Sequence, residues 1–398
     1  MSAPDSHGAR PPRGAVPLGY AAYEALEERP HVMVDGAARR SSVVTLSHWP
    51  QSPTPQVLAR DLSVEIALEY VRLATGRASS GRRARPQVLA LLAAGRQAEA
   101  VTNDHFDEDG VMSVLALVDP EFSLGHARLL VDAASCGDFG VVTSEAGASI
   151  AFAIGPLAEQ EAGAGAGTSE RYLAVLPRIR DLVEHPDRYE ALWHEEMRVY
   201  LAGRASIERG DVVITDDVAD LAIVTRGDPE ALGSPGASAG TTRLIGASGG
   251  LPVHAASVHS ATPASRVLAF DGSRCELYLR YEGWVRYVSR PVPLRPDLEP
   301  LAGELTSLEP GQVTWEANPV GAIVGRLRPS ADSLTEIAPE VIAERVRSYL
   351  LDAPPAWDPF RSGGSYVAER RERRDERTTR PSGRRKGAGR RPKRGGSR

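Results

Sequence analysis

One run of residues in this sequence has the composition that a divalent-cation site needs. The apolar segment Ala98–Thr102 predicts a short buried strand, which leads directly into His105, Asp107 and Asp109. Gly110 follows, and the apolar segment from Val111 to Val118 then predicts a helix. Oxygen ligands favour Mg²⁺ or Mn²⁺, and the imidazole shifts the preference towards Mn²⁺, Fe or Zn²⁺. The run therefore predicts a metal site at the carboxyl end of a strand.

The remaining pattern predicts two domains between disordered ends. In residues 31–225, short apolar strands alternate with helical patterns, which indicates an α/β domain with a largely parallel sheet. Residues 226–250 are rich in Gly, Ser, Ala and Pro and predict a flexible linker. Residues 251–360 predict a smaller α+β domain, whereas residues 1–30 and 361–398 have the composition of disordered termini.

The sequence also predicts several local elements. The second domain should contain strands at Val253–Val258, Arg266–Phe270, Cys275–Tyr281 and Trp284–Ser289, with a hairpin turn at Asp271–Ser273. In the first domain, Pro120–Ala134 predicts one helix, and Gly137–Val142 predicts a junction between a loop and a strand. Strands at Val212–Ile214 and Leu221–Thr225 are expected to close the first domain.

Composition excludes several classes of protein. No apolar run reaches the ~18–20 residues needed to cross a bilayer, and no secretory signal is visible. The two cysteines, Cys136 and Cys275, are too few for a disulfide framework and favour a reducing cytoplasm. Lysine occurs only at positions 386 and 393, which excludes a P-loop or a Schiff-base lysine in the folded body. Nucleotide-cofactor and serine-hydrolase motifs are absent from the sequence.

The carboxyl-terminal tail is strongly basic. Residues 369–398 hold 14 Lys/Arg and 4 Asp/Glu, a local net charge of +10, so the remaining body carries about −15 of the total of −5. Such a tail can bind nucleic acid by neutralising phosphates, or it can be an ordinary solvated segment. The candidate contacts for nucleic acid are Arg384, Arg385, Lys386, Arg390, Arg391, Lys393 and Arg394.

The run from His105 to Ser113, His-Phe-Asp-Glu-Asp-Gly-Val-Met-Ser, resembles motif I of the DHH phosphoesterase superfamily, in the form found in RecJ-type exonucleases. The resemblance implies an α/β domain that holds two Mn²⁺ or Mg²⁺ ions, with His105, Asp107 and Asp109 as metal ligands and catalytic residues, and a second domain that binds substrate. The name-giving Asp-His-His and the Gly-Gly-His motif are absent, although Gly249–Ala256 is a loose echo of the latter. The whole chain also resembles an uncharacterised actinobacterial family.

These residues support two main alternatives, with a metal enzyme of different chemistry as a third. The chain is either a divalent-metal phosphoesterase, acting on a phosphodiester or a small phosphorylated substrate, or a non-catalytic protein that binds nucleic acid or a partner through its tail. In the second case His105 and Asp107 would cap the following helix. Asp138 is a candidate further ligand, although a plain turn aspartate is the commoner reading of its position.

The other histidines give weaker signals. His126 and Asp132 do not share a helix face, and His194 is a possible substitute ligand. His48-Trp49-Pro50 starts a loop whose tryptophan either lines a pocket or anchors the loop. His254 and His259 lie five residues apart on a predicted strand, so they should point to opposite faces and not share a metal.

Overall fold

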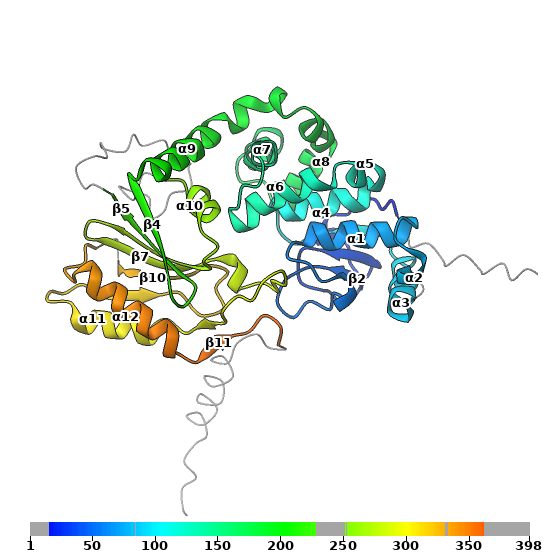
Figure 1. Cartoon of the computed structure of the whole chain (residues 1–398). Coiled ribbons are helices and arrows are strands. Elements are labelled where there is room, and N and C mark those ends of the chain that lie inside the picture. The colour runs from blue at the N-terminus through cyan, green and yellow to red at the C-terminus, as the bar shows by residue number, and fades with distance from the viewer. Residues whose placement is uncertain (1–15, 84, 228–250, 252, 331–332, 362–398) are drawn as a thin grey trace, which may run out of the picture.

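The structure is a computed structural model, and it describes residues 16–227 except 84 and residues 251–361 except 252 and 331–332. Two lobes, each built on its own sheet, lie side by side (Figure 1). We call residues 16–209 the first lobe and residues 212–361 the second lobe. The predicted mixed α/β fold is confirmed. The linker at 228–250 and the basic residues Arg384 to Arg394 lie outside the described residues.

The first lobe contains a parallel sheet of three strands in the order β2-β1-β3. Its strands are β1 (His31–Val34), β2 (Ser42–Leu46) and β3 (Ala100–Thr102). His31 pairs with Ser42 on one side and with Ala100 on the other, so the carboxyl ends of all three strands meet at one edge. The apolar residues of these strands are almost fully buried except Val43, which is partly buried, as expected when helices cover a parallel sheet.

Helices form the rest of the first lobe: α4 (Glu108–Val118) contacts the sheet, α6 (Ala127–Phe139) packs on α4, α7 (Glu145–Ala162) packs on α6, and the last two helices both pack on α7 (Figure 1). Two helices begin beside the sheet edge described above: α1 begins after Leu62, whose N–H donates to the Glu65 carboxylate (3.2 Å), and α4 begins after Asp107. The helices are α1 (Ser63–Thr75), α2 (Ser80–Arg83), α3 (Pro86–Gly95), α4 (Glu108–Val118), α5 (Pro120–Gly125), α6 (Ala127–Phe139), α7 (Glu145–Ala162), α8 (Thr168–Glu184) and α9 (Glu190–Arg209), with short 3-10 turns at η1 (Tyr23–Ala25), η2 (Gln56–Leu58) and η3 (Pro186–Tyr189).

The second lobe contains a six-stranded sheet in the order β4-β5-β6-β7-β10-β9. Neighbouring strands are antiparallel except β5 and β6, which are parallel. Val267 and Ala269 pack on one face of the sheet, while Leu268 and Phe270 pack on the other, as the period of a strand requires. The strands are β4 (Val212–Asp217), β5 (Leu221–Arg226), β6 (Arg266–Asp271), β7 (Arg274–Leu279), β9 (Trp315–Ala317) and β10 (Gly325–Pro329).

Helices cover both faces of this sheet (Figure 1). Two of them, α11 (Glu299–Leu308) and α12 (Pro339–Asp352), supply Leu301 and Val346 to the hydrophobic cluster that contains Leu268. On the opposite face lies α10 (Ala255–Ala261), with Val258 in the cluster that contains Val267. A 3-10 turn, η4 (Tyr281–Gly283), and a small pair of strands, β8 (Arg295–Pro296) and β11 (Pro355–Trp357), complete the lobe.

Five local predictions were wrong. Residues 120–134 form two helices, and α6 then continues through Phe139, so Asp138 lies in the last helical turn instead of at a junction with a strand. Residues 255–261 form helix α10, and residues 284–289 form no strand. Strands β4 and β5 belong to the second sheet, because β5 pairs with β6. A short segment with alternating apolar residues does not reveal which sheet will accept it.

The first residues of the described chain were expected to be disordered, and they are packed instead. Tyr20 forms a bridge with Val101, and Leu26 is almost fully buried. None of the helices within the described ranges is both long enough and apolar enough to span a membrane. The predicted hairpin at 271–273 is confirmed: it joins β6 to β7, and Gly272 has the positive φ of 58° that such a turn needs.

Candidate metal site

Polar residues follow each of the three parallel strands of the first lobe. Asp35 follows β1, His48 lies two residues after β2, and His105 lies three residues after β3. Because the strands are parallel and in register, these residues gather at one edge of the sheet. Ligand sites of open α/β sheets lie at this kind of edge, outside the carboxyl ends of the strands.

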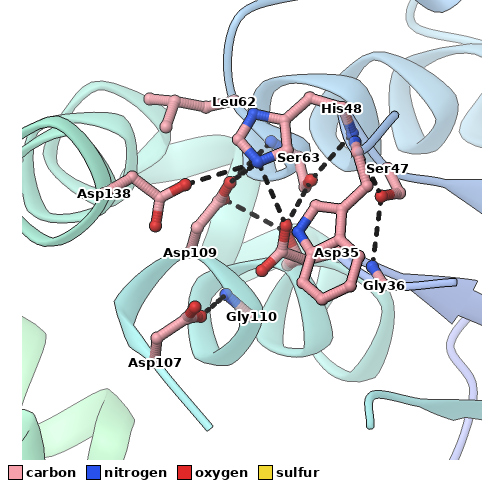
Figure 2. Close-up of polar contacts among 12 residues, drawn as sticks. Asp35, Gly36, Ser47, His48, Leu62, Ser63, Asp107, Asp109, Gly110 and Asp138 are labelled. Carbon is pink, nitrogen blue, oxygen red and sulfur yellow. Dashed lines mark hydrogen bonds and ion pairs between the residues drawn. The ribbon is translucent and has the colours of Figure 1, made fainter. Parts of the chain in front are cut away.

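The imidazole of His48 is the centre of the first group of side chains. Its Nε2 atom lies 3.4 Å from Oδ1 of Asp35, 3.4 Å from Oδ2 of Asp138 and 4.0 Å from Oδ2 of Asp109. Figure 2 shows these three carboxylates pointing towards the ring, with Asp138 reaching it from α6. The side chains of His48 and Asp109 are completely buried, and that of Asp138 is 5% exposed.

The proton on His48 can be assigned from its neighbours. Nδ1 lies at hydrogen-bond distance from the backbone carbonyl of Asp61, which can only accept, so Nδ1 carries the proton. Burial lowers the pKa of His48, so the ring is neutral at neutral pH and Nε2 presents a lone pair. That lone pair faces oxygen atoms of Asp35 and Asp138. A cation placed among these atoms removes the repulsion between them.

The amino terminus of α1 fixes two of these carboxylates. The backbone N–H groups of Ser63 and Val64 donate to the two oxygens of Asp109, each at 2.7 Å. The Ser63 hydroxyl donates to Oδ1 of Asp35, also at 2.7 Å. Unpaired N–H groups at the start of a helix suit an anion, which explains how Asp109 can be fully buried. The sequence did not predict this contact between the start of α1 and the acidic run.

A second group of side chains surrounds His105. Its Nε2 atom lies 2.8 Å from Oδ2 of Asp107 and 3.2 Å from Oδ2 of Asp35, while Nδ1 lies 2.9 Å from Oδ1 of Asp104. The ring of Trp49 stacks on that of His105, with centroids 4.9 Å apart. Asp35 thus contributes one oxygen to each group, and the two groups form one continuous site.

The capping alternative is realised in part. Oδ1 of Asp107 accepts the Gly110 N–H (2.8 Å) and caps α4, while Oδ2 faces His105. His105 itself makes no side-chain cap to this helix. Gly110 has no room for a side chain, because an added Cβ would lie 2.5 Å from Nδ2 of Asn103 and 2.5 Å from the Tyr172 hydroxyl. The turn therefore requires glycine for close packing.

The charges of the site are unbalanced. The two groups contain five aspartates, at 35, 104, 107, 109 and 138, but only two imidazoles. Burial, and then repulsion by neighbouring carboxylates, holds the pKa values of Asp109 and Asp138 well above 3.8. The pKa of Asp107 is raised for the same reasons. Buried carboxylates that repel one another are stabilised when cations are bound.

For Asp35 and His105, contacts with neighbouring groups outweigh the effect of burial on the pKa. Burial acts to raise the pKa of Asp35, but the contacts with His105 and Ser63 outweigh it and hold the pKa below 3.8. Burial likewise acts to lower the pKa of His105, but its hydrogen bonds to Asp104, Asp107 and Asp35 outweigh it and raise the pKa strongly. Without a metal, His105 therefore supplies positive charge to this cluster.

The residues present fit a divalent cation. Among the described residues, no hydrogen bond reaches Oδ2 of Asp138, although this atom is buried and lies beside His48. Asp35, His48 and Asp109 form one set of ligand atoms that lie within 4.8 Å of one another, and Asp35, His105 and Asp107 form another. Carboxylate and imidazole ligands together suit Mn²⁺, and Asp104 would orient His105 through Nδ1.

Sequence reasoning missed Asp35 and His48 as members of the site. Asp35 directly follows an apolar strand and precedes Gly36, the same pattern that singled out the acidic run. Its backbone has a positive φ of 41°, a conformation that functional residues adopt more often than structural ones. His48 was considered only together with Trp49. Their positions in the sequence could have identified both residues, because each follows a predicted strand of a parallel sheet.

Other candidate residues lie elsewhere in the fold. His194 is exposed on α9 and pairs with Glu190 (3.4 Å), so it does not substitute for a ligand. His126 stacks on Phe122, and Asp132 accepts hydrogen bonds from Thr143 and Ser144 ahead of α7. These residues have structural roles.

The fold and this site define a mixed α/β protein with a buried carboxylate–histidine cluster at the edge of a parallel sheet. The chain belongs to the family of unknown function DUF6687, whose sequence model matches residues 16–360. No curated protein and no solved structure matches the chain significantly.

Proposed function

We propose that this protein is a divalent-metal-dependent phosphoesterase that hydrolyses a phosphodiester or a small phosphorylated substrate. The observation that carries the proposal is the convergence of Asp35, Asp109 and Asp138 on the unprotonated Nε2 of His48. The proposed ions are Mn²⁺ or Mg²⁺, and Asp35 belongs to both groups of residues that would hold them. The resemblance to motif I of the DHH phosphoesterases supports the same chemistry.

Divalent ions bound here would supply the positive charge that phosphoryl transfer requires. The residues of the chain hold and orient the site. Asp109 is fixed by the start of α1, and the Ser63 hydroxyl orients Asp35. Nδ1 of His105 remains bound to Asp104, so Nε2 is free for a ligand role once its proton has been released.

The location that we propose for this activity is the cytoplasm. Cys136 and Cys275 are both buried and unpaired, as is usual for proteins of a reducing compartment.

The proposal is tested by metal content and by hydrolysis of bis(p-nitrophenyl) phosphate with added Mn²⁺. Asp35→Asn should lose both bound metal and activity, because it removes charge from both groups. Asp352→Asn, at the exposed end of α12, is the matched control and should retain both. A native protein that binds no metal would overturn the proposal, and the cluster would then be structural, with nucleic-acid or partner binding through the tail as the remaining alternative.

A further inference from the structure

A cavity of about 550 Å³ lies between the two lobes and reaches the candidate metal site. We call it the interlobe cavity. Its first-lobe walls come from α6, α7 and α9, and its second-lobe walls come from α10, β7 and the turn that follows β7. Asp138 and Glu108 line it on the side of the metal site, together with Tyr281, whose hydroxyl lies 3.4 Å from Nε2 of His48. A molecule in the cavity would therefore lie directly beside the proposed metals.

The size of the cavity fits a small molecule. Sites for small ligands commonly enclose about 300–1,000 Å³. Apolar side chains form much of the wall, among them Phe152, Leu192 and Val324. The lining thus provides an apolar surface beside a polar one, which suits a compact organic group attached to a phosphate.

The cationic side chains of the lining are already engaged. The Arg280 guanidinium donates to the carbonyls of Thr262 (3.1 Å) and Ala264 (3.0 Å) and pairs with Glu282 (2.7 Å). His259 donates from Nδ1 to the Phe139 carbonyl (2.9 Å), and its Nε2 is held by the Tyr278 hydroxyl. These groups build the wall and do not provide a site for an anion.

Carboxylates dominate the rest of the polar lining. Glu108 and Asp138 lie near the metal site, and Glu195 and Glu196 lie on α9. Glu196 accepts from Nε2 of His254 (2.6 Å), and Glu195 pairs with Arg198 (2.6 Å). Carboxylates accept hydrogen bonds and attract cations, so they favour a ligand that carries hydroxyl or ammonium donors. A second anionic group on the ligand would be repelled.

We propose that the interlobe cavity binds the organic group of a small phosphate ester, that this group carries hydroxyl or ammonium donors on a compact frame, and that Glu108 contacts it. This inference rests on the proposed function, because the metals would hold the phosphate. It names a small phosphorylated molecule, not a nucleic-acid chain, as the substrate class.

Gly155 of α7 offers a way to block the cavity without disturbing the fold. It lines the cavity, and a Cβ added to it would have no atom within 4 Å. Gly155→Phe should therefore place a ring in the cavity. Gly303→Phe on α11 is the matched control, because Gly303 is also helical, also has open space around it and does not line the cavity.

The test measures binding of phosphonates to the Mn²⁺-loaded protein by calorimetry, since their carbon–phosphorus bond resists hydrolysis. The native protein and Gly303→Phe should bind 2-aminoethylphosphonate and 2-hydroxyethylphosphonate at least about tenfold more tightly than phosphonoacetate, a difference of about 1.4 kcal/mol. In Gly155→Phe this preference should disappear, while methylphosphonate and Mn²⁺ still bind. Glu108→Gln should weaken the preference for the ammonium compound most.

The possible failures can be distinguished. Equal or tighter binding of phosphonoacetate, or a preference that survives in Gly155→Phe, would overturn the cavity proposal while the metal site stands. A single-stranded oligonucleotide that competes with methylphosphonate more strongly than either donor-bearing phosphonate would also overturn it. If neither Mn²⁺ nor methylphosphonate binds, the proposed function fails and the cavity proposal fails with it.

Discussion

Nε2 of His48 lies 3.4 Å from Oδ2 of Asp138, although His48 follows β2 and Asp138 ends α6. Neither atom supplies a proton to this contact. The proton of His48 is on Nδ1, and a carboxylate oxygen of Asp138 can only accept hydrogen bonds. Two electron-rich atoms held this close in a buried site require a cation between them, or a proton on the carboxyl group. Burial and the neighbouring carboxylates raise the pKa of Asp138, which favours the protonated acid when no metal is bound.

Replacing His48 should remove one metal and leave the other. His48→Gln takes the imidazole from the group formed with Asp35 and Asp109, but it leaves His105 and Asp107 in place. Metal analysis after dialysis against Mn²⁺ should show a loss of about half of the bound metal. His194→Gln, at an exposed position on α9, should bind as much as the native protein. Unchanged metal content in His48→Gln would contradict the assignment.

Ser63→Ala should weaken metal binding without removing a ligand. The Ser63 hydroxyl donates to Oδ1 of Asp35 (2.7 Å), and it orients the carboxylate that both groups share. Loss of such a supporting hydrogen bond lowers metal affinity by about 10–100-fold. Calorimetric titration with Mn²⁺ measures the change, and Ser307→Ala on α11 serves as the control. An unaltered affinity would show that Ser63 has no part in holding Asp35.

Gly110→Ala should destabilise the protein by about 1–3 kcal/mol, as overpacking of a buried position does. The new Cβ would lie 2.5 Å from both Nδ2 of Asn103 and the Tyr172 hydroxyl. Gly303→Ala, at a helical position with open space, should keep or increase stability. Unfolding in urea gives both values. A variant as stable as the native protein would show that the acidic turn is less tightly packed than described.

The metal-free protein should lose stability as the pH rises above 6.5. Burial, and then Asp107, raises the pKa of Glu108 from 4.5 to about 7, and the pKa values of Asp109, Asp138 and His105 are also raised. In this range the folded state binds more protons than the unfolded state, so the free energy of unfolding falls as pH increases. His48 and His259 have lowered pKa values and act in the opposite sense, but only below their unfolded value of 6.5.

Urea unfolding in EDTA between pH 6.5 and about 8.5 tests this sign. Glu108→Gln should show a shallower decrease, because it removes the group that titrates within the range. Added Mn²⁺ should stabilise the protein more at the upper end, since deprotonated carboxylates bind metal better. Stability that rises with pH in EDTA would contradict the electrostatic description of the site.

The sequence could predict the part of the site that is continuous along the chain. His105, Asp107 and Asp109 follow one strand within five positions, so the local pattern alone identified them. Asp35 and His48 join them only through the parallel pairing of β1 with β2 and β3. Such pairing depends on contacts between distant segments, which the apolar pattern of a short strand does not specify.

The second lobe contains one element that the sequence could predict and one that it could not. The hairpin between β6 and β7 was predictable, because its turn residues and both strands are adjacent in sequence. The segment 253–258 alternates as a strand would, yet residues 255–261 form α10, and this brings His254 and His259 to one cavity. Packing of α10 on the face of the larger sheet therefore outweighs the alternating pattern of residues 253–258.

Contacts from the second lobe hold the backbone that presents the candidate metal site. His259 holds the carbonyl of Phe139, next to Asp138, and the Arg286 N–H donates to the carbonyl of His48 (2.8 Å). A molecule bound in the interlobe cavity would contact the same segments that set the distance between Asp138 and His48. Recognition of the substrate and alignment of these two residues would then occur together. A molecule that fits the cavity poorly would leave these residues misaligned. It would therefore lower kcat as well as raise KM.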